Sequence, residues 1–393
     1  MTPSIWKQTS FERVEYEARL DGLQRRLADA KIDAALLNSE FNLEYFSGLE
    51  TQFPWNSPSR AVHLIVPVSG EPIGIVPEIL AGVWRRSSWV SRIETWPSPR
   101  PEDEGVREIL GVLAQLPRKF GRIGIEMGPE SRLGMTVGDL RLLEESLMAQ
   151  ELADVSAICQ QVRLIKSPAE IARIAKACEI TSSAFAALPA RLASGVSEVE
   201  AVAGFCAAAI SQGATSIPFI GSGSGQGGYE GVVSSPSDTV LREGDVFFID
   251  AGVKYRGYSA DFDRNFGIGR VDEETRHLHR LLYDATEAGI AACVPGARAQ
   301  DVFRAQAMVL EDAGIKVGST GRLGHGLGKQ LTEPPSNTSG DHTELAANMV
   351  MTVEPAATNS NGLILVHEEN LVVTEDGPRL LSHRTPAELP IIC

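Results

Sequence analysis

Residues 244–261, GDVFFIDAGVKYRGYSAD, hold two aspartates beside short apolar runs. Val246–Ile249 is typical of a buried strand, here one that ends at Asp250. Two glycines then lead through a predicted turn to a second segment, which ends at Asp261. Asp250 and Asp261 could therefore lie on paired strands, although taken alone two aspartates with this spacing are more typical of turns and surfaces.

Three later segments place further metal-binding side chains at the edges of apolar runs: GHGLG (324–328), MTVEP (351–355) and ILVHE (364–368). Buried carboxylates so close together cannot all stay ionised without cations. Oxygen ligands with one imidazole suit manganese, iron(II), cobalt or zinc, and two ions that share carboxylates activate a water. The pattern predicts a hydrolytic centre with two divalent metal ions.

The length suggests two or three domains, of which two is the expectation, and the composition is that of a soluble globular protein. The 393 residues are 43% hydrophobic and 22% charged, with no apolar run of membrane-spanning length. The first residues, with Trp6, Lys7 and Glu12, are not typical of a secretory signal. We expect a cytoplasmic protein. The formal net charge of -15 argues against nucleic acid and anionic membranes as partners. The five scattered cysteines predict reduced thiols.

The first part of the chain alternates helix and strand patterns. Helical spacing over residues 11–30 precedes an apolar run at 33–38, and further strands are expected at 61–66, 72–76 and 122–126. A helix is expected near 107–116. This alternation predicts an α/β domain.

Two capping boxes indicate where the second domain begins. Ser167–Glu170 and Ser197–Glu200 each predict the start of a helix. The glycine-rich segment 221–231 lacks the residues of a phosphate-binding loop and is expected to be a flexible loop beside a site.

Taken together, these motifs resemble the pita-bread metallopeptidases, which include methionine aminopeptidase, prolidase, aminopeptidase P and the non-peptidase creatinase. The stretches that carry the resemblance are 163–170, 244–252, 257–261, 324–328, 353–355 and 367–377. Residues 33–37, 42–48 and 122–126 are similar to the smaller domain of prolidase and creatinase. The resemblance implies a creatinase N-domain-like α/β domain over 1–160 and a pita-bread α+β catalytic domain over 161–393.

The resemblance also implies the roles of the site residues. Asp250 would bind one ion, His325 and Glu354 the other, and Asp261 and Glu368 would bridge them, with His325 and Glu354 also catalytic. Glu369 is a rival for the last position, but the spacing to Thr374 in the family selects Glu368.

Three positions depart from the family pattern. Val233 and Thr332 stand where the peptidases have histidines that hold the scissile carbonyl and stabilise the tetrahedral intermediate. Ordinary Xaa-Pro cleavage is therefore doubtful. Asp263 replaces the usual threonine, and is predicted to contact substrate or metal, or to pair with a nearby cation.

Further substrate contacts are expected from Tyr258 and from the smaller domain. The family implies a homodimer in which the partner's small domain covers the pocket, and Trp55 and Arg60 lie in the corresponding loop. Arg60 aligns with an arginine that creatinase offers to its substrate's carboxylate. A packed aromatic and a solvated charge are equally good interpretations of these two residues.

We therefore expect a metal-dependent hydrolase of the creatinase and Xaa-Pro peptidase type. It would cleave a C–N bond of a small amino-acid-derived or dipeptide-like substrate by a metal-bound hydroxide. A lyase of the dimethylsulfoniopropionate-cleaving type is the first alternative. A metal-free creatinase-like enzyme and a non-catalytic binding protein are the others, and the intact set of ligands argues against both.

Overall fold

The computed structural model describes residues 11–51, 53–56, 60–147, 150–317 and 321–392. Contacts between residues divide the chain into two compact units, Met1–Arg163 and Leu164–Cys393. Each unit has its own sheet and its own hydrophobic clusters. Within the described part of the chain, none of the helices combines the length and the apolar character needed to cross a membrane.

The N-terminal unit is built on a six-stranded mixed sheet of order β4-β3-β2-β1-β5-β6. Its strands are β1 (Ala34–Leu37), β2 (His63–Pro67), β3 (Ile73–Pro77), β4 (Ile93–Trp96), β5 (Arg122–Ile125) and β6 (Glu151–Asp154). β1 pairs antiparallel with β2 and parallel with β5. The strands that the apolar runs predicted at the start of the chain are confirmed.

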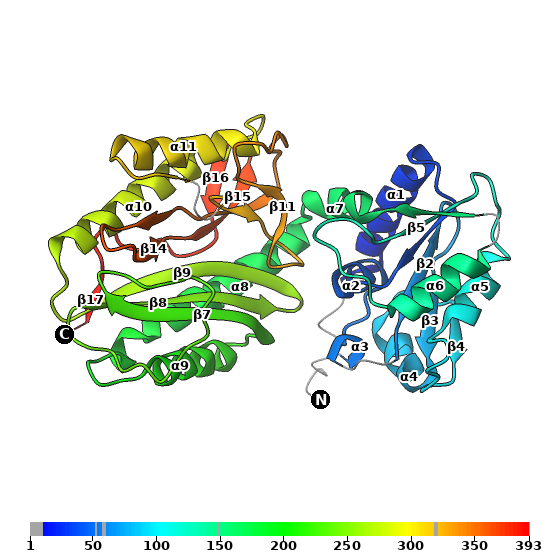
Figure 1. Ribbon diagram of the computed structural model, residues 1–393. Helices are drawn as coiled ribbons and strands as arrows, with labels where there is room; N and C mark the ends of the chain where they lie inside the picture. Colours follow the sequence, from blue (N-terminus) through cyan, green and yellow to red (C-terminus); the bar gives the residue numbers. More distant parts are fainter. Residues whose placement is uncertain (1–10, 52, 57–59, 148–149, 318–320, 393) are drawn as a thin grey trace. The chain divides into compact units, whose positions relative to one another are not determined.

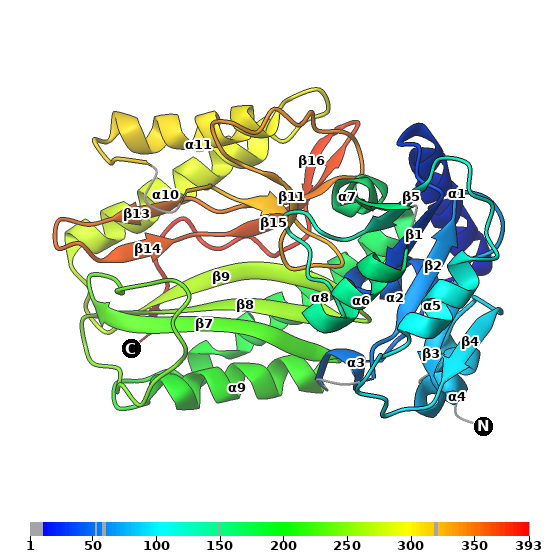
Figure 2. The ribbon, with the colours of Figure 1, turned by 45° about the vertical axis from the view of Figure 1, so that its right-hand side comes forward.

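Helices cover both faces of this sheet, because its central strand is apolar on both sides. Ala35 and Leu37 pack in one hydrophobic cluster with α1, while Ala34 and Leu36 pack in the other with α5. Figure 2 shows α1 and α5 on opposite sides of the strands. The helices are α1 (Arg13–Asp29), α2 (Glu40–Ser47), α3 (Phe53–Asn56), α4 (Glu78–Ser87), α5 (Val106–Leu113), α6 (Val137–Ser146) and α7 (Ser156–Leu164).

The C-terminal unit contains two main sheets. One has four strands in the order β17-β9-β8-β7, and the other has five in the order β11-β10-β12-β15-β16. The strands are β7 (Ser216–Gln226), β8 (Asp245–Tyr255), β9 (Tyr258–Ile268), β10 (His325–Gly326), β11 (Glu333–Ser336), β12 (Val350–Val353), β13 (Ala356–Thr358), β14 (Ile364–Val366), β15 (Glu369–Thr374), β16 (Gly377–Leu380) and β17 (Ile391–Ile392).

Four long helices surround these sheets: α8 (Pro168–Ala187), α9 (Glu198–Ser211), α10 (Glu273–Ala292) and α11 (Ala299–Asp312). In Figure 1, α8 and α9 lie along β7–β9, and α10 and α11 lie along the other strands. Both predicted capping boxes are present, at Ser167 before α8 and at Ser197 before α9. The expected α/β domain followed by an α+β domain is confirmed.

Two details of the sequence prediction are wrong. Asp250 does not end a strand, because β8 continues to Tyr255 and the carboxylate lies in its middle. The glycine-rich segment is not a loop throughout, since residues 221–226 belong to edge strand β7. In both places hydrogen bonds to the neighbouring strand extend the ladder beyond the apolar residues.

Candidate metal centre

The hairpin β8–β9 places three aspartates on one face of the sheet. Phe262 packs against Phe185 of α8, with ring centroids 5.7 Å apart. Because side chains alternate along a strand, Asp261 and Asp263 point to the opposite face. Asp250 is the cross-strand partner of Asp263 and shares that face.

His325 is held by its backbone and by one ring nitrogen. The preceding Gly324 has φ +120°, and a Cβ there would lie 2.3 Å from the Thr352 carbonyl oxygen. The His325 amide donates to the Thr352 hydroxyl at 3.1 Å. Nδ1 lies 2.9 Å from the Gly326 carbonyl oxygen, so Nδ1 carries the hydrogen and Nε2 keeps a lone pair. The imidazole is therefore oriented as metal ligands usually are.

The two glutamates come from the ends of neighbouring strands. Glu354 follows β12 directly, as predicted, and Glu368 lies between β14 and β15. Glu369 has a different environment, because it is paired with Arg264 at 3.0 Å and with Arg384 at 3.2 Å. Glu369 is thus paired with these two arginines. Glu368 instead belongs to an acidic cluster with Asp250, Asp261 and Glu354.

Asp261, His325 and Glu368 converge. Each offers one ligand atom, and these atoms lie within 4.8 Å of one another. His325 Nε2 is 3.6 Å from Asp261 Oδ2 and 4.0 Å from Glu354 Oε2. Asp250 belongs to the same electrostatic cluster, since its charge acts on both Asp261 and Glu368.

Without bound cations, the ionised state of the carboxylates in this cluster is electrostatically unfavourable. Burial, reinforced by the neighbouring Glu354, raises the pKa of Asp250 to about 8. Burial likewise raises the pKa of Glu354 to about 7, against the effect of Arg322. The pKa values of Asp261 and Glu368 are raised well above the usual range for the same reason. Burial and Arg322 lower the pKa of His325 to about 4, so the imidazole is neutral.

These residues fit divalent metal ions. Asp250 Oδ1 and Glu368 Oε1 are buried and have no hydrogen-bond partner among the described residues. Buried carboxylate oxygens without donors are costly, and a cation would satisfy them. Several carboxylates with one neutral imidazole form a donor set suited to manganese, iron(II), cobalt or zinc.

Stability of the metal-free protein is expected to fall as the pH rises. The pKa of Asp250 increases from 3.8 in its ordinary state to about 8 in the fold. Between pH 3.8 and about pH 8, Asp250 is ionised in the unfolded chain but still protonated in the folded protein. The unfolded chain therefore binds fewer protons, and the free energy of unfolding decreases as the pH rises. Each 1 kcal/mol of stability that is lost lowers the Tm of a domain of 150–250 residues by roughly 2–4 °C. Thermal unfolding of chelator-treated protein at pH 5 and pH 8 measures this effect.

Asp250→Asn, which cannot ionise, should reduce this pH dependence in the metal-free state, while Asp261, Glu354 and Glu368 maintain the remainder. The metal-loaded protein should also lose less stability between pH 5 and pH 8, because bound cations compensate the carboxylates. A metal-free Tm that is equal or higher at pH 8 would show that the cluster does not carry this electrostatic cost.

Arg322 is a cation beside the cluster that the sequence interpretation missed. Its positive charge lowers the pKa values of Asp261, Glu354 and His325. It is partly exposed, and its guanidinium donates to the Thr332 hydroxyl at 3.4 Å. Its position three residues before His325 was the available signal.

The remaining predicted contacts have different environments. Val233 is 77% exposed. Tyr258 is 1% exposed, and its hydroxyl donates to Glu170 at 2.8 Å, so that hydroxyl is engaged inside the C-terminal unit. Trp55 and Arg60 belong to the N-terminal unit, and their contact with substrate stays a prediction.

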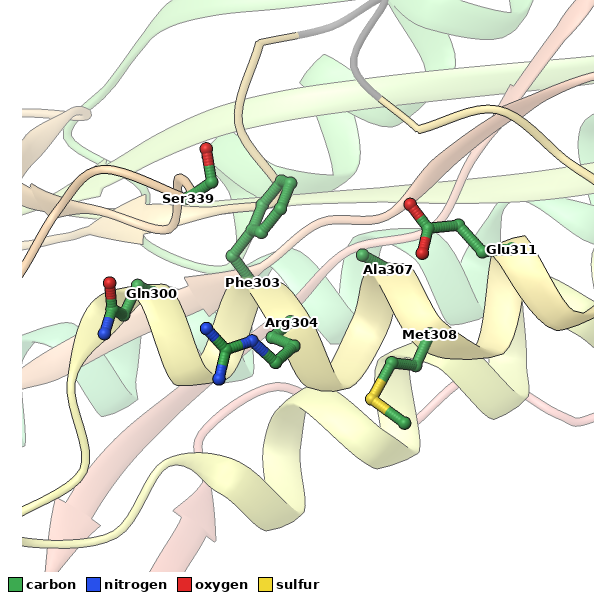
Figure 3. A pocket seen from close by; sticks show the side chains of 7 residues that line it. All are labelled: Gln300, Phe303, Arg304, Ala307, Met308, Glu311 and Ser339. Carbon is green, nitrogen blue, oxygen red and sulfur yellow. The ribbon is translucent and has the colours of Figure 1, made fainter.

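A separate hollow of about 130 Å³ lies on α11 (Figure 3). Residues of α11, among them Phe303, Arg304 and Glu311, line it together with Ser339. It contains none of the predicted site residues, so the chemistry of the protein is not expected there.

Two family models match the chain. Metallopeptidase family M24 matches residues 172–376, and the creatinase/prolidase N-terminal domain matches residues 19–165. The first match covers the β8–β9 hairpin, His325 and both glutamates of the cluster. Fold and match together define a metal-dependent hydrolase. The chain belongs to metallopeptidase family M24.

Relatives of similar length support this assignment. The uncharacterized peptidase YqhT of Bacillus subtilis (strain 168) is 26% identical to this chain. The match covers 95% of this chain and 100% of the length of YqhT. The crystal structure of dipeptidase PepE from Mycobacterium ulcerans is 25% identical, with a TM-score of 0.84 and coverage of 98% and 99%. Prolidase from Thermococcus sibiricus has a TM-score of 0.86 at 22% identity, with coverage of 96% and 99%, and shows the shared pita-bread fold.

Proposed function

We propose that this protein hydrolyses the C–N bond of a dipeptide or of a similarly small amino-acid derivative with two divalent metal ions. Asp250, Asp261, His325, Glu354 and Glu368 would hold the ions. The observation that carries the proposal is the convergence of Asp261, His325 and Glu368 within 4.8 Å. Bound divalent ions supply Lewis acidity and activate a water for attack on the substrate carbonyl.

Glu354 is the cluster carboxylate best placed to move protons. Its side chain is 24% exposed, whereas the side chains of Asp261 and His325 are 7% and 4% exposed. A general acid–base group must reach both the attacking water and the leaving nitrogen. Glu354 would therefore take a proton from the water and pass it to the nitrogen of the leaving group.

Arg322 would bind the carboxylate of the substrate. A planar guanidinium can form two parallel hydrogen bonds with a carboxylate, in a geometry that lysine cannot reproduce. The Thr332 hydroxyl accepts a hydrogen bond from Arg322 and so orients it. The names of the relatives, which include a probable dipeptidase and several prolidases, agree with a small substrate with a free carboxylate.

Weak hydrolysis of Xaa-Pro dipeptides is expected from the wild-type protein. Neither the apolar Val233 nor the neutral Thr332 replaces an imidazole that stabilises the tetrahedral intermediate, and each lost contact costs on the order of 10²-fold in rate. Val233→His should raise kcat/KM for Xaa-Pro dipeptides by a comparable factor, with Thr332 kept in place because its hydroxyl accepts a hydrogen bond from Arg322. Steady-state kinetics with the metal-loaded proteins measures the change.

Val240→His is the matched control, because Val240 is also an exposed valine in the segment between β7 and β8. It should leave hydrolysis of Xaa-Pro dipeptides unchanged. Efficient cleavage of these dipeptides by the wild-type protein, abolished in His325→Ala, would show that other groups replace the missing histidines.

A substrate panel tests the proposed reaction. Metal-loaded protein is incubated with dipeptides, amidated dipeptides and small N-substituted amino acids, and the products are identified by mass spectrometry. Uptake of one water per C–N bond cleaved, and its loss on chelation, supports hydrolysis. Cleavage without uptake of water would identify a lyase, and turnover that persists after complete metal removal would refute the metal-dependent mechanism.

A further inference from the structure

Asp263 is a buried carboxylate of the cluster that the five proposed ligands do not include. It lies two residues after Asp261 on β9 and directly across from Asp250 on β8. Its exposed fraction is 1%. All three side chains share one face of the sheet, because residues two apart and cross-strand partners point the same way.

Only one oxygen of Asp263 has a hydrogen-bond donor. Oδ1 accepts from the Asn265 side-chain amide at 3.4 Å. Oδ2 is fully buried and has no hydrogen-bond partner in the described ranges. Asp250 Oδ1 and Glu368 Oε1 are likewise buried without a hydrogen-bond partner among the described residues. The cluster therefore holds three carboxylate oxygens without a donor.

The adjacent Arg264 donates no hydrogen bond to the carboxylate of Asp263 in the part of the chain that the structure describes. One guanidinium nitrogen of Arg264 donates to the backbone carbonyls of Asp263 and Glu368. Its other terminal nitrogen pairs with Glu369 and donates to the His383 carbonyl. No ion pair of the Asp263 side chain occurs among the residues that the structure describes. An unsatisfied buried carboxylate is strongly unfavourable, and a cation bound to Asp263 Oδ2 would remove this cost.

We infer that Asp263 is an additional ligand of the metal centre, binding the ion held by Asp250. This inference rests on the proposed two-metal function. It adds a fifth carboxylate to Asp250, Asp261, Glu354 and Glu368, against the four positive charges of two divalent ions. The neutral His325 does not change this balance, so the protein ligands outweigh the ions by one negative charge.

The added charge has a specific consequence for the ions. It strengthens binding of the ion at Asp250 more than binding of the ion at His325, because the attraction decreases with distance. It also occupies a coordination position that a threonine would leave to water. The two sites are therefore expected to differ in affinity, with the Asp250 site the tighter.

Cobalt titration of Asp263→Asn and Asp263→Thr tests the inference. Both variants remove the charge, and asparagine keeps the size of the side chain. Competition with a chromophoric chelator gives the two dissociation constants, and the visible absorption of bound Co²⁺ reports its coordination. We expect weaker binding of one ion by at least about 10-fold, as for groups that support metal sites, with a changed spectrum for that ion alone.

Asp245→Asn is the matched control. Asp245 is also buried on β8, but it accepts a hydrogen bond from the Arg242 amide, so its substitution should leave both constants unchanged. Wild-type dissociation constants and spectra in folded Asp263→Asn or Asp263→Thr would overturn the inference. Failure of the wild-type protein to bind two ions would instead refute the proposed two-metal function. Thermal unfolding of each variant identifies those that fold.

Discussion

Asp261→Ala is expected to release at least one of two divalent ions and to lower kcat/KM by at least about 10³-fold, because metal activation supplies several kcal/mol of transition-state stabilisation. Asp261 would bridge the two ions, and its Oδ2 lies 3.6 Å from His325 Nε2. Its loss therefore removes a ligand from both ions at once. Elemental analysis after dialysis and steady-state kinetics measure the two effects.

A buried aspartate outside the cluster provides the control. Asp245→Ala on β8 should retain both ions, since Asp245 bonds to a backbone amide within its own turn. Restoring activity to Asp261→Ala with excess metal would place the defect in affinity alone. An unchanged metal content in Asp261→Ala would refute the bridging assignment, whatever happens to the rate.

The sequence predicted the strands of the site more reliably than their limits. The apolar runs before Asp250 and Glu354 predicted buried strands correctly. The end of β8 could not be predicted, because Val253 to Tyr255 extend the strand through pairing with β9. Pairing across a sheet depends on residues that are distant along the chain, and a local pattern does not contain them.

The choice between Glu368 and Glu369 likewise separates what local spacing predicts from what depends on residues distant along the chain. Spacing to Thr374 selected Glu368, and the structure places Glu368 with Asp261 and His325. The reason is visible only in three dimensions, where Arg264 and Arg384 pair with Glu369. Arg322 was missed for a related reason, since its electrostatic effect on Asp261 and Glu354 comes from packing, not from spacing.

Arg322→Ala is expected to lower kcat/KM for substrates with a free carboxylate by about 100-fold, as for the loss of hydrogen bonds between two charged groups. Metal content should not fall, because Arg322 is a cation beside an acidic cluster and its removal does not weaken attraction for divalent ions. Most of the change should appear in KM if the carboxylate is bound equally in ground and transition states. Kinetics combined with metal analysis separates these contributions.

Amidated substrates supply the decisive comparison for Arg322. They lack the carboxylate, so wild-type protein and Arg322→Ala should cleave them at similar rates, and Arg322→Lys should recover only part of the loss on free carboxylates. Arg304→Ala, which changes an exposed arginine of the separate hollow in Figure 3, should behave as wild type. Equal losses on free and amidated substrates would contradict carboxylate binding by Arg322 and would shift that role to another cation, with Arg60 the first to test.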